Sequence, residues 1–203
     1  MSPYSRRAFL AATGAALLTG CAATPDHRTA TTPPTRTAGA PSAPGTVRPL
    51  GRSVPVGLLI PAIGVDTPLL RLGLAADGTV EVPPITADDR AGWYRYSPTP
   101  GQTGPSVILG HVTVGPYGDG VFRRLDRLRR GDGITARLEN GTTAAFAVTD
   151  VRTVDKADFP TEDVYGNVNR PELRLITCGG PHDGEGYRDN VIVFAALSAA
   201  GAR

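Results

Sequence analysis

From Val54 onward, short apolar runs alternate with turn residues, and this pattern constrains the fold more than any other feature. The first stretch, VPVGLLIPAIGVDTPLL, holds two strand-like runs broken by Pro61 and Gly64. The 203 residues include 25 Gly and 19 Pro, which suits many short strands and turns better than long helices. We therefore expect a mainly β domain.

Further runs of the same kind follow along the chain. LAADGTVEVPP places an Asp77-Gly78 turn before a short strand, and AGWYRY, SVILGHV, LRLITC and VIVFAAL read as strands. Asn140-Gly141 lies between two apolar runs and is a strong hairpin signal. About eight short strands at this spacing predict a closed, eight-stranded β-barrel.

One segment has the period of a helix instead. In GVFRRLDRLRRGD, the apolar residues Val121, Phe122, Leu125 and Leu128 stand at helical spacing, so we expect one short helix here, in a fold with one or two. The arginines between them are interpreted as a solvated face. The net charge of +2 gives no indication of a nucleic-acid partner.

The N-terminus has the order of an export signal. Arg6 and Arg7 precede an apolar stretch over residues 8–19, which is too short for a comfortable membrane span of about 20 residues. SRRAFL resembles a twin-arginine signal, and LTGC resembles a bacterial lipobox, in which Cys21 would be lipidated. The alternative is an ordinary cleaved signal that leaves Cys21 removed or unused. Either way, Cys21 is not available to Cys178.

The chain divides into three parts on this basis. Residues 1–21 form the signal, and residues 22–53 form a linker rich in Thr, Pro and Ala that is predicted to be disordered because it has few apolar residues to bury. The lone His27 of the linker is expected to be solvated and idle. Residues 54–203 form the folded domain.

Cys178 is the residue that most invites a chemical interpretation. It ends a strand-like run and has no intramolecular disulfide partner in an oxidising compartment, so it is a candidate reactive thiol. His111 also follows a strand-like run, and Arg188 opens the last strand. A thiolate, an imidazole that takes its proton, and a guanidinium that stabilises an oxyanion are the parts that acyl transfer needs.

Other interpretations of the same residues stay open at this point. Cys178 could be a small buried apolar residue, His111 could be structural, and Arg188 could pair with Asp189 or Asp183. Cys178, His111 and His182 could also ligate a metal, although they lack the paired spacing typical of such sites.

The motifs around these residues resemble those of sortases. LITCGG followed by YRDNVIVFA is similar to the sortase active-site pattern, and LGHVT is similar to the histidine strand. The resemblance extends over Val54 to Leu197 and is strongest to class F sortases of Gram-positive actinobacteria. It implies that Cys178 is the nucleophile, His111 the catalytic histidine and Arg188 the oxyanion-stabilising arginine, and that Thr177 lines the site.

The resemblance also implies a reaction and a location. A sortase cleaves an LPXTG-like sorting signal between Thr and Gly, keeps the acyl part as a thioester, and transfers it to an amine such as a cell-wall precursor, or to water. No metal or organic cofactor is implied. The expected location is the extracytoplasmic face of the membrane of a Gram-positive cell, with a lipid anchor through Cys21.

Two rival functions remain at this stage. One is an L,D-transpeptidase of the cell wall, which also uses exported Cys and His but sets its cysteine in a different motif. The other is a catalytically silent lipoprotein that uses the same fold as a binding module.

Overall fold

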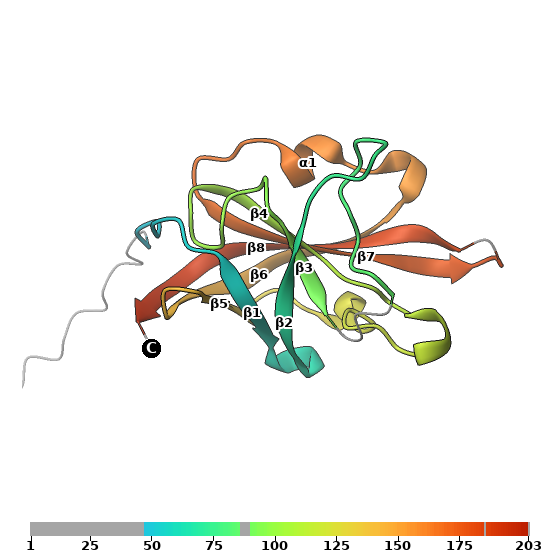
Figure 1. Ribbon diagram of the computed structural model, residues 1–203, viewed down its shortest axis with the longest axis horizontal. Helices are drawn as coiled ribbons and strands as arrows, with labels where there is room; N and C mark the ends of the chain where they lie inside the picture. Colours follow the sequence, from blue (N-terminus) through green and yellow to red (C-terminus); the bar gives the residue numbers. More distant parts are fainter. Residues whose placement is uncertain (1–46, 86–89, 185, 203) are drawn as a thin grey trace, which may run out of the picture. The chain divides into compact units, whose positions relative to one another are not determined.

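Eight strands close into a barrel in the computed structural model, which describes residues 47–85, 90–184 and 186–202 (Figure 1). The strands neighbour one another in the order β1-β2-β3-β4-β7-β8-β6-β5, and β5 pairs with β1 to close the barrel. The predicted closed β-barrel is confirmed. The strands are β1 Pro55–Ile60, β2 Val65–Leu72, β3 Ala91–Tyr94, β4 Gly104–Leu109, β5 Gly133–Leu138, β6 Thr142–Asp155, β7 Pro171–His182 and β8 Tyr187–Ala202.

β4 and β7 lie side by side and parallel, and both are buried on their two faces. The inner faces belong to the barrel core, where the largest buried side chains are Trp93, Phe122 and Phe146. The outer faces are covered by the connection between β6 and β7, whose Val164 is fully buried against Val107, Ile176, Ile192 and Phe194. Burial on both faces explains why these two strands read as nearly continuous apolar runs.

The helices are short, and one of them differs from the sequence prediction. The helix α1 covers Thr161–Tyr165, and four 3₁₀ turns cover Pro61–Ile63 (η1), Gly115–Tyr117 (η2), Leu125–Arg127 (η3) and Lys156–Asp158 (η4). The short helix expected around Leu125 is present only as the 3₁₀ turn η3. Phe122, Leu125 and Leu128 are all buried, and their spacing of three matches the 3₁₀ repeat.

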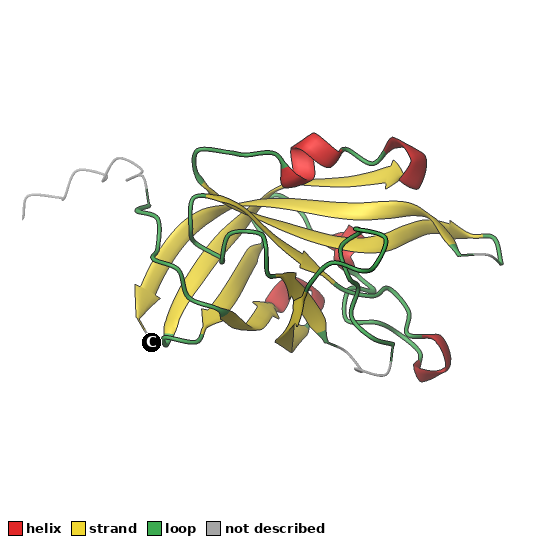
Figure 2. Ribbon diagram, turned by 45° about the horizontal axis from the view of Figure 1, so that its top comes forward, coloured by secondary structure: helices red, strands yellow, loops and turns green. Residues whose placement is uncertain are grey.

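Two hairpins join neighbouring antiparallel strands, one between β5 and β6 and the other between β7 and β8. Asn140-Gly141 makes the predicted β5–β6 turn, in which Gly141 has a φ of 80° and the Asn140 side chain accepts a hydrogen bond from the Thr142 amide at 3.1 Å. β7 and β8 continue as a two-stranded ribbon beyond the barrel, on the right of Figure 1 and again in Figure 2. The β7–β8 ladder extends to the pair His182 and Tyr187.

The residues just before β1 contact the barrel, although the expected linker extends to residue 53. The Leu50 amide donates to the Gly101 carbonyl at 2.8 Å, and its side chain packs against the core. The expected signal, the lipobox Cys21 and His27 lie outside the described residues. Within the described part of the chain, no helix is long and apolar enough to cross a membrane.

A buried ion pair fixes the connection that covers the outer face. Arg174 on β7 is 3% exposed and donates through Nη2 to Glu172, which is 6% exposed, at 2.5 Å. Its Nε donates to the Asp163 carbonyl at 3.1 Å, which satisfies a carbonyl in the last turn of α1. The Asp163 carboxylate accepts from Arg152 at 2.7 Å, so two arginines hold this residue of α1. Both guanidinium groups stack on the Phe194 ring, at 4.5 and 4.6 Å.

Replacing Arg174 with Met should destabilise the domain. The buried Glu172 carboxylate then keeps only the exposed Arg170 as its ion-pair partner, and breaking a buried pair costs about 3–5 kcal/mol. Arg170→Met is the matched control, since its side chain is 69% exposed and should cost about 1 kcal/mol or less. Urea denaturation measures both values. Equal losses of unfolding free energy in the two variants would contradict the assignment of Arg174 as the main ion-pair partner of Glu172.

Candidate functional site

His111 lies two residues beyond the end of β4, and its backbone is closely held. Its carbonyl accepts a hydrogen bond from the Phe122 amide at 2.9 Å. Gly120 packs against the same carbonyl so closely that a Cβ at this position would lie 2.3 Å from the oxygen. The imidazole Nε2 lies 2.5 Å from the carbonyl oxygen of Pro83. The His111 ring is therefore held in place by the contacts of its own backbone and by the contact of Nε2 with Pro83.

Cys178 is a free cysteine on β7 and is partly exposed. It pairs with Asn190 of β8 at the point where β7 passes the end of β4, since the last β4–β7 pair is Leu109 with Ile176. The glycines that follow Cys178 allow β7 and β8 to approach each other closely. A Cβ on Gly180 would meet the Asp189 carboxylate at 2.1 Å, and its φ of 71° also favours glycine.

The parallel register brings Cys178 and His111 to the same rim. Leu109 pairs with Ile176, and the Gly110 amide donates to the Ile176 carbonyl at 3.1 Å, so the register continues past the last strand residue. His111 and Cys178 each follow this pair by two residues. Because side chains alternate along a strand, both belong to the same outer face, and neighbouring strands are about 4.8 Å apart.

Arg188 is on the same face of the ribbon as Cys178 but is engaged elsewhere. Asn190 is directly opposite Cys178, and Arg188 is two residues before Asn190 on β8. The ladder is irregular here, with two β7 residues, Gly180 and Pro181, facing the single Arg188. The Arg188 side chain is 63% exposed and its Nε donates to the Asp183 carboxylate at 2.9 Å. One of the two ion pairs considered from the sequence is thus present.

Thr177 lies behind Cys178, on the opposite face of β7. It is 4% exposed, and its hydroxyl has no hydrogen-bond partner among the described residues. It lines a pocket of about 340 Å³ that also touches Cys178 and Tyr187. Thr177 and Cys178 therefore border the same pocket, although their side chains alternate along β7.

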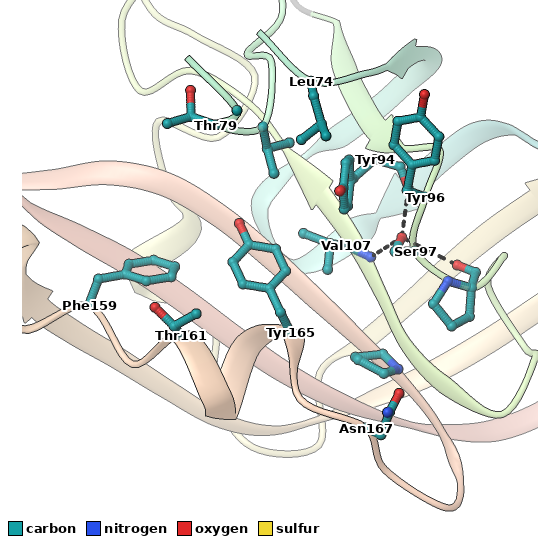
Figure 3. Close-up of a pocket in the computed structure, with 14 residues that line it drawn as sticks. Leu74, Thr79, Tyr94, Tyr96, Ser97, Val107, Phe159, Thr161, Tyr165 and Asn167 are labelled. Atoms are coloured by element: carbon teal, nitrogen blue, oxygen red, sulfur yellow. Dashed lines mark hydrogen bonds between the residues drawn. The ribbon is translucent and has the colours of Figure 1, made fainter. Parts of the chain in front are cut away.

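A large pocket lies over the outer face of β4 (Figure 3). It has a volume of about 610 Å³, and Pro105 and Val107 of β4 line it. Val107 precedes His111 by four residues, which corresponds to about 13 Å along an extended strand. Aromatic rings form much of its wall, from the β3 side and from the α1 side. They are Tyr94, Tyr96, Phe159 and Tyr165.

Two of these rings meet across the pocket. Tyr94 and Tyr165 pack edge to face with their centroids 6.4 Å apart, and burial raises the pKa of Tyr165, so its hydroxyl stays protonated at neutral pH. Ser97 closes one end by accepting from the Val107 amide at 3.1 Å and donating to the Tyr94 carbonyl at 2.7 Å (Figure 3). An extended apolar segment fits such a groove.

The metal alternative finds no support in the described residues. His182 lies on the ribbon, where its ring packs edge to face on Tyr187 at 4.9 Å and its Nδ1 accepts from the Gly184 amide. No group of three His, Cys, Asp or Glu side chains in residues 47–85, 90–184 and 186–202 could hold an ion.

Sequence reasoning missed the aromatic groove and the Pro83 contact. Tyr94 and Tyr165 are 71 positions apart, and no periodic signal links them. The only sequence hint of a groove was that the strand of Val107 leads directly to His111.

Comparisons with known proteins agree with this geometry. A family model described as "Sortase domain" matches residues 58–198. Among solved structures, the chain is similar to the SrtA sortase of Actinomyces oris, with 27% identity, a TM-score of 0.56, and coverage of 80% of this chain and 90% of that one. Among curated proteins, no sequence match was found.

Two further solved structures share the fold at lower identity. Sortase A of Listeria monocytogenes has 17% identity and a TM-score of 0.56, covering 74% of this chain and 91% of that one. Sortase C of Streptococcus pneumoniae, a pilin sortase, has 22% identity and a TM-score of 0.51, covering 70% and 64%. The family match spans well over half of the chain and includes Cys178, His111 and Arg188. The chain therefore belongs to the sortase family of cysteine transpeptidases.

Proposed function

We propose that this protein is an exported sortase of the class F type that cleaves an LPXTG-like sorting signal between Thr and Gly. The observation that carries the proposal is the β4–β7 register, which sets Cys178 and His111 at one rim, together with the aromatic-lined groove over β4. The partly exposed thiol and the family match support the same assignment.

The acylation step uses three side chains in order. The Cys178 thiolate attacks the carbonyl carbon of the Thr–Gly amide, and the carbonyl oxygen becomes an oxyanion. The Arg188 guanidinium stabilises this charge. The C–N bond then breaks, the leaving amine takes a proton from the protonated His111, and the acyl part stays on sulfur as a thioester.

The second half of the reaction resolves the thioester. An amine attacks the same carbonyl carbon and gives a proton to His111, and the C–S bond breaks to release the Cys178 thiolate. Water in place of the amine gives hydrolysis. The acceptor we propose is an amine of a cell-wall precursor or a pilin lysine, in line with the pilin specificity named for the pneumococcal neighbour.

The aromatic groove would hold the residues before the scissile bond. Its position about 13 Å upstream of His111 corresponds to about four extended residues. The Leu and Pro of an LPXTG-like motif are apolar and stand three and two residues before its Thr, so the walls formed by Tyr94 and Tyr165 suit them.

Tyr165→Ala should raise the KM for a sorting-signal peptide about tenfold and leave kcat within about twofold, because the ring contributes binding that is equal in the ground and transition states. Tyr165→Phe is the matched control and should keep the wild-type KM, since it retains the aromatic ring that lines the groove. Steady-state cleavage of a fluorescent peptide measures both. A loss of kcat with unchanged KM would contradict this role.

Arg188→Ala should lower kcat/KM about 10²- to 10³-fold, the typical effect of removing one oxyanion donor. Asp183→Asn should not reproduce this loss, because it weakens the ion pair of Arg188 with Asp183 and leaves the guanidinium in place. The same peptide assay measures both variants. An active Arg188→Ala enzyme would mean that another group stabilises the oxyanion.

We further propose an extracytoplasmic location with a lipid anchor on Cys21. The apolar stretch after Arg6-Arg7 and the LTGC motif support it. Cys21→Ser should release the protein from the membrane fraction of its host. A variant that stays membrane-bound would contradict the lipid anchor and leave the chemistry of Cys178 unaffected.

A further inference from the structure

A short segment between β2 and β3 reaches the His111 ring. We call residues 81–85 the strap. Pro83 is buried, while its neighbours Val82 and Ile85 are 60% and 50% exposed. The Pro83 carbonyl oxygen lies 2.5 Å from His111 Nε2. The strap therefore buries Pro83 and directs its backbone carbonyl toward the His111 imidazole.

Glu81 fixes the start of the strap. Its amide donates to the Gly73 carbonyl at 3.1 Å, and its carboxylate accepts from the Gly73 amide at 2.5 Å. This reciprocal pair ties the strap to the residue that follows β2. Glu81 is two residues before Pro83, so these two hydrogen bonds limit how far the Pro83 carbonyl can move from the His111 imidazole.

The contact decides which nitrogen of His111 carries the proton. A carbonyl oxygen only accepts hydrogen bonds, so Nε2 must be the donor. A neutral imidazole has one N–H, and its lone pair must then be on Nδ1. A base that is held in one tautomer by a third group is the arrangement that activates Cys and Ser nucleophiles.

We propose that the Pro83 carbonyl is the positioning group of His111 and that Glu81, through the strap, is a positioning residue. In this arrangement Nε2–H stays bonded to Pro83 throughout the reaction. Nδ1 carries the proton taken from the Cys178 thiol before attack and gives it to the leaving amine. The role in turnover rests on the proposed function, but the tautomer does not.

Nitrogen NMR of the full chain with ¹⁵N-labelled histidine tests the tautomer directly. The chain has only His27, His111 and His182, and His111→Gln identifies the signals of the site. In its neutral form, His111 should show a protonated Nε2 and an unprotonated Nδ1. The opposite tautomer, or rapid averaging between the two, would overturn the proposal whether or not the protein cleaves a peptide.

Strap variants test the link to turnover. Glu81→Ala should give a mixture of His111 tautomers and lower kcat roughly 10- to 100-fold, with KM within about twofold. Glu81→Gln keeps an acceptor for the Gly73 amide and should restore both readouts. Asp77→Ala is the control in the same connection, because Asp77 bonds only within its own turn, to Thr79.

The outcomes separate the strap from the proposed function. Faster turnover in Glu81→Ala would make the strap an inhibitor and overturn its positioning role. Unchanged turnover with a changed tautomer would overturn it too. A wild-type protein that cleaves no sorting-signal peptide but shows the Nε2–H tautomer would contradict the proposed function and leave the Pro83 contact standing.

Discussion

Replacing Cys178 with Ala should reduce kcat/KM for a sorting-signal peptide by about 10⁴-fold or more, because no other group in the proposed mechanism can form the acyl-enzyme. The fold should be preserved. The side chain is partly exposed and small, so little packing is lost. Peptide cleavage and the thermal unfolding midpoint, measured on the same preparation, check the two halves of this expectation.

The controls for this experiment also address the silent binding module. Cys178→Ser keeps the shape of the side chain but should be nearly as inactive as the Ala variant, since a hydroxyl is a much weaker nucleophile than a thiolate. A wild-type protein that binds the peptide without cleaving it, and whose affinity is the same in both variants, would favour the module over the enzyme.

Replacing His111 with Gln should lower kcat/KM about 10²- to 10⁴-fold, the range expected for loss of a general acid–base group. His182→Gln is the matched control. It is the other histidine in the described residues, and it packs on Tyr187 of the β7–β8 ribbon, so its loss should change kcat/KM by no more than about twofold. Peptide cleavage by the two variants gives the comparison.

Equal losses in the two histidine variants would contradict the assignment, because they would place the effect in the ribbon and not in acid–base chemistry. A His111→Gln enzyme that retains wild-type turnover would show that another group handles the proton. The Pro83 contact would then be structural.

Most of the fold could be predicted from the sequence because it depends on local patterns. The strand-like runs, the Asn140-Gly141 hairpin and the break at Pro61 and Gly64 each reflect backbone preferences of a few residues. The short helix expected around Leu125 has the same origin. A spacing of three fits both a short α-helix and a 3₁₀ turn, and the chain forms the turn η3 over Leu125–Arg127.

The candidate site could be predicted only in part, for a different reason. Cys178, His111 and Arg188 stand in motifs that each resemble a sortase, so residue types and order sufficed to select them. The Pro83 carbonyl has no side-chain signature, because any residue supplies the same acceptor. The pairing of Arg188 with Asp183 was one option among two, and only the course of the ribbon distinguishes them.

The most direct test of the central claim is intact-protein mass spectrometry of the enzyme mixed with a sorting-signal peptide and no amine acceptor. The account predicts a species heavier by the acyl part of the peptide up to its Thr, mapped to Cys178 and removed by added amine with formation of the peptide–amine product. Cleavage of the peptide without any such adduct, or an adduct that persists in Cys178→Ala, would contradict it.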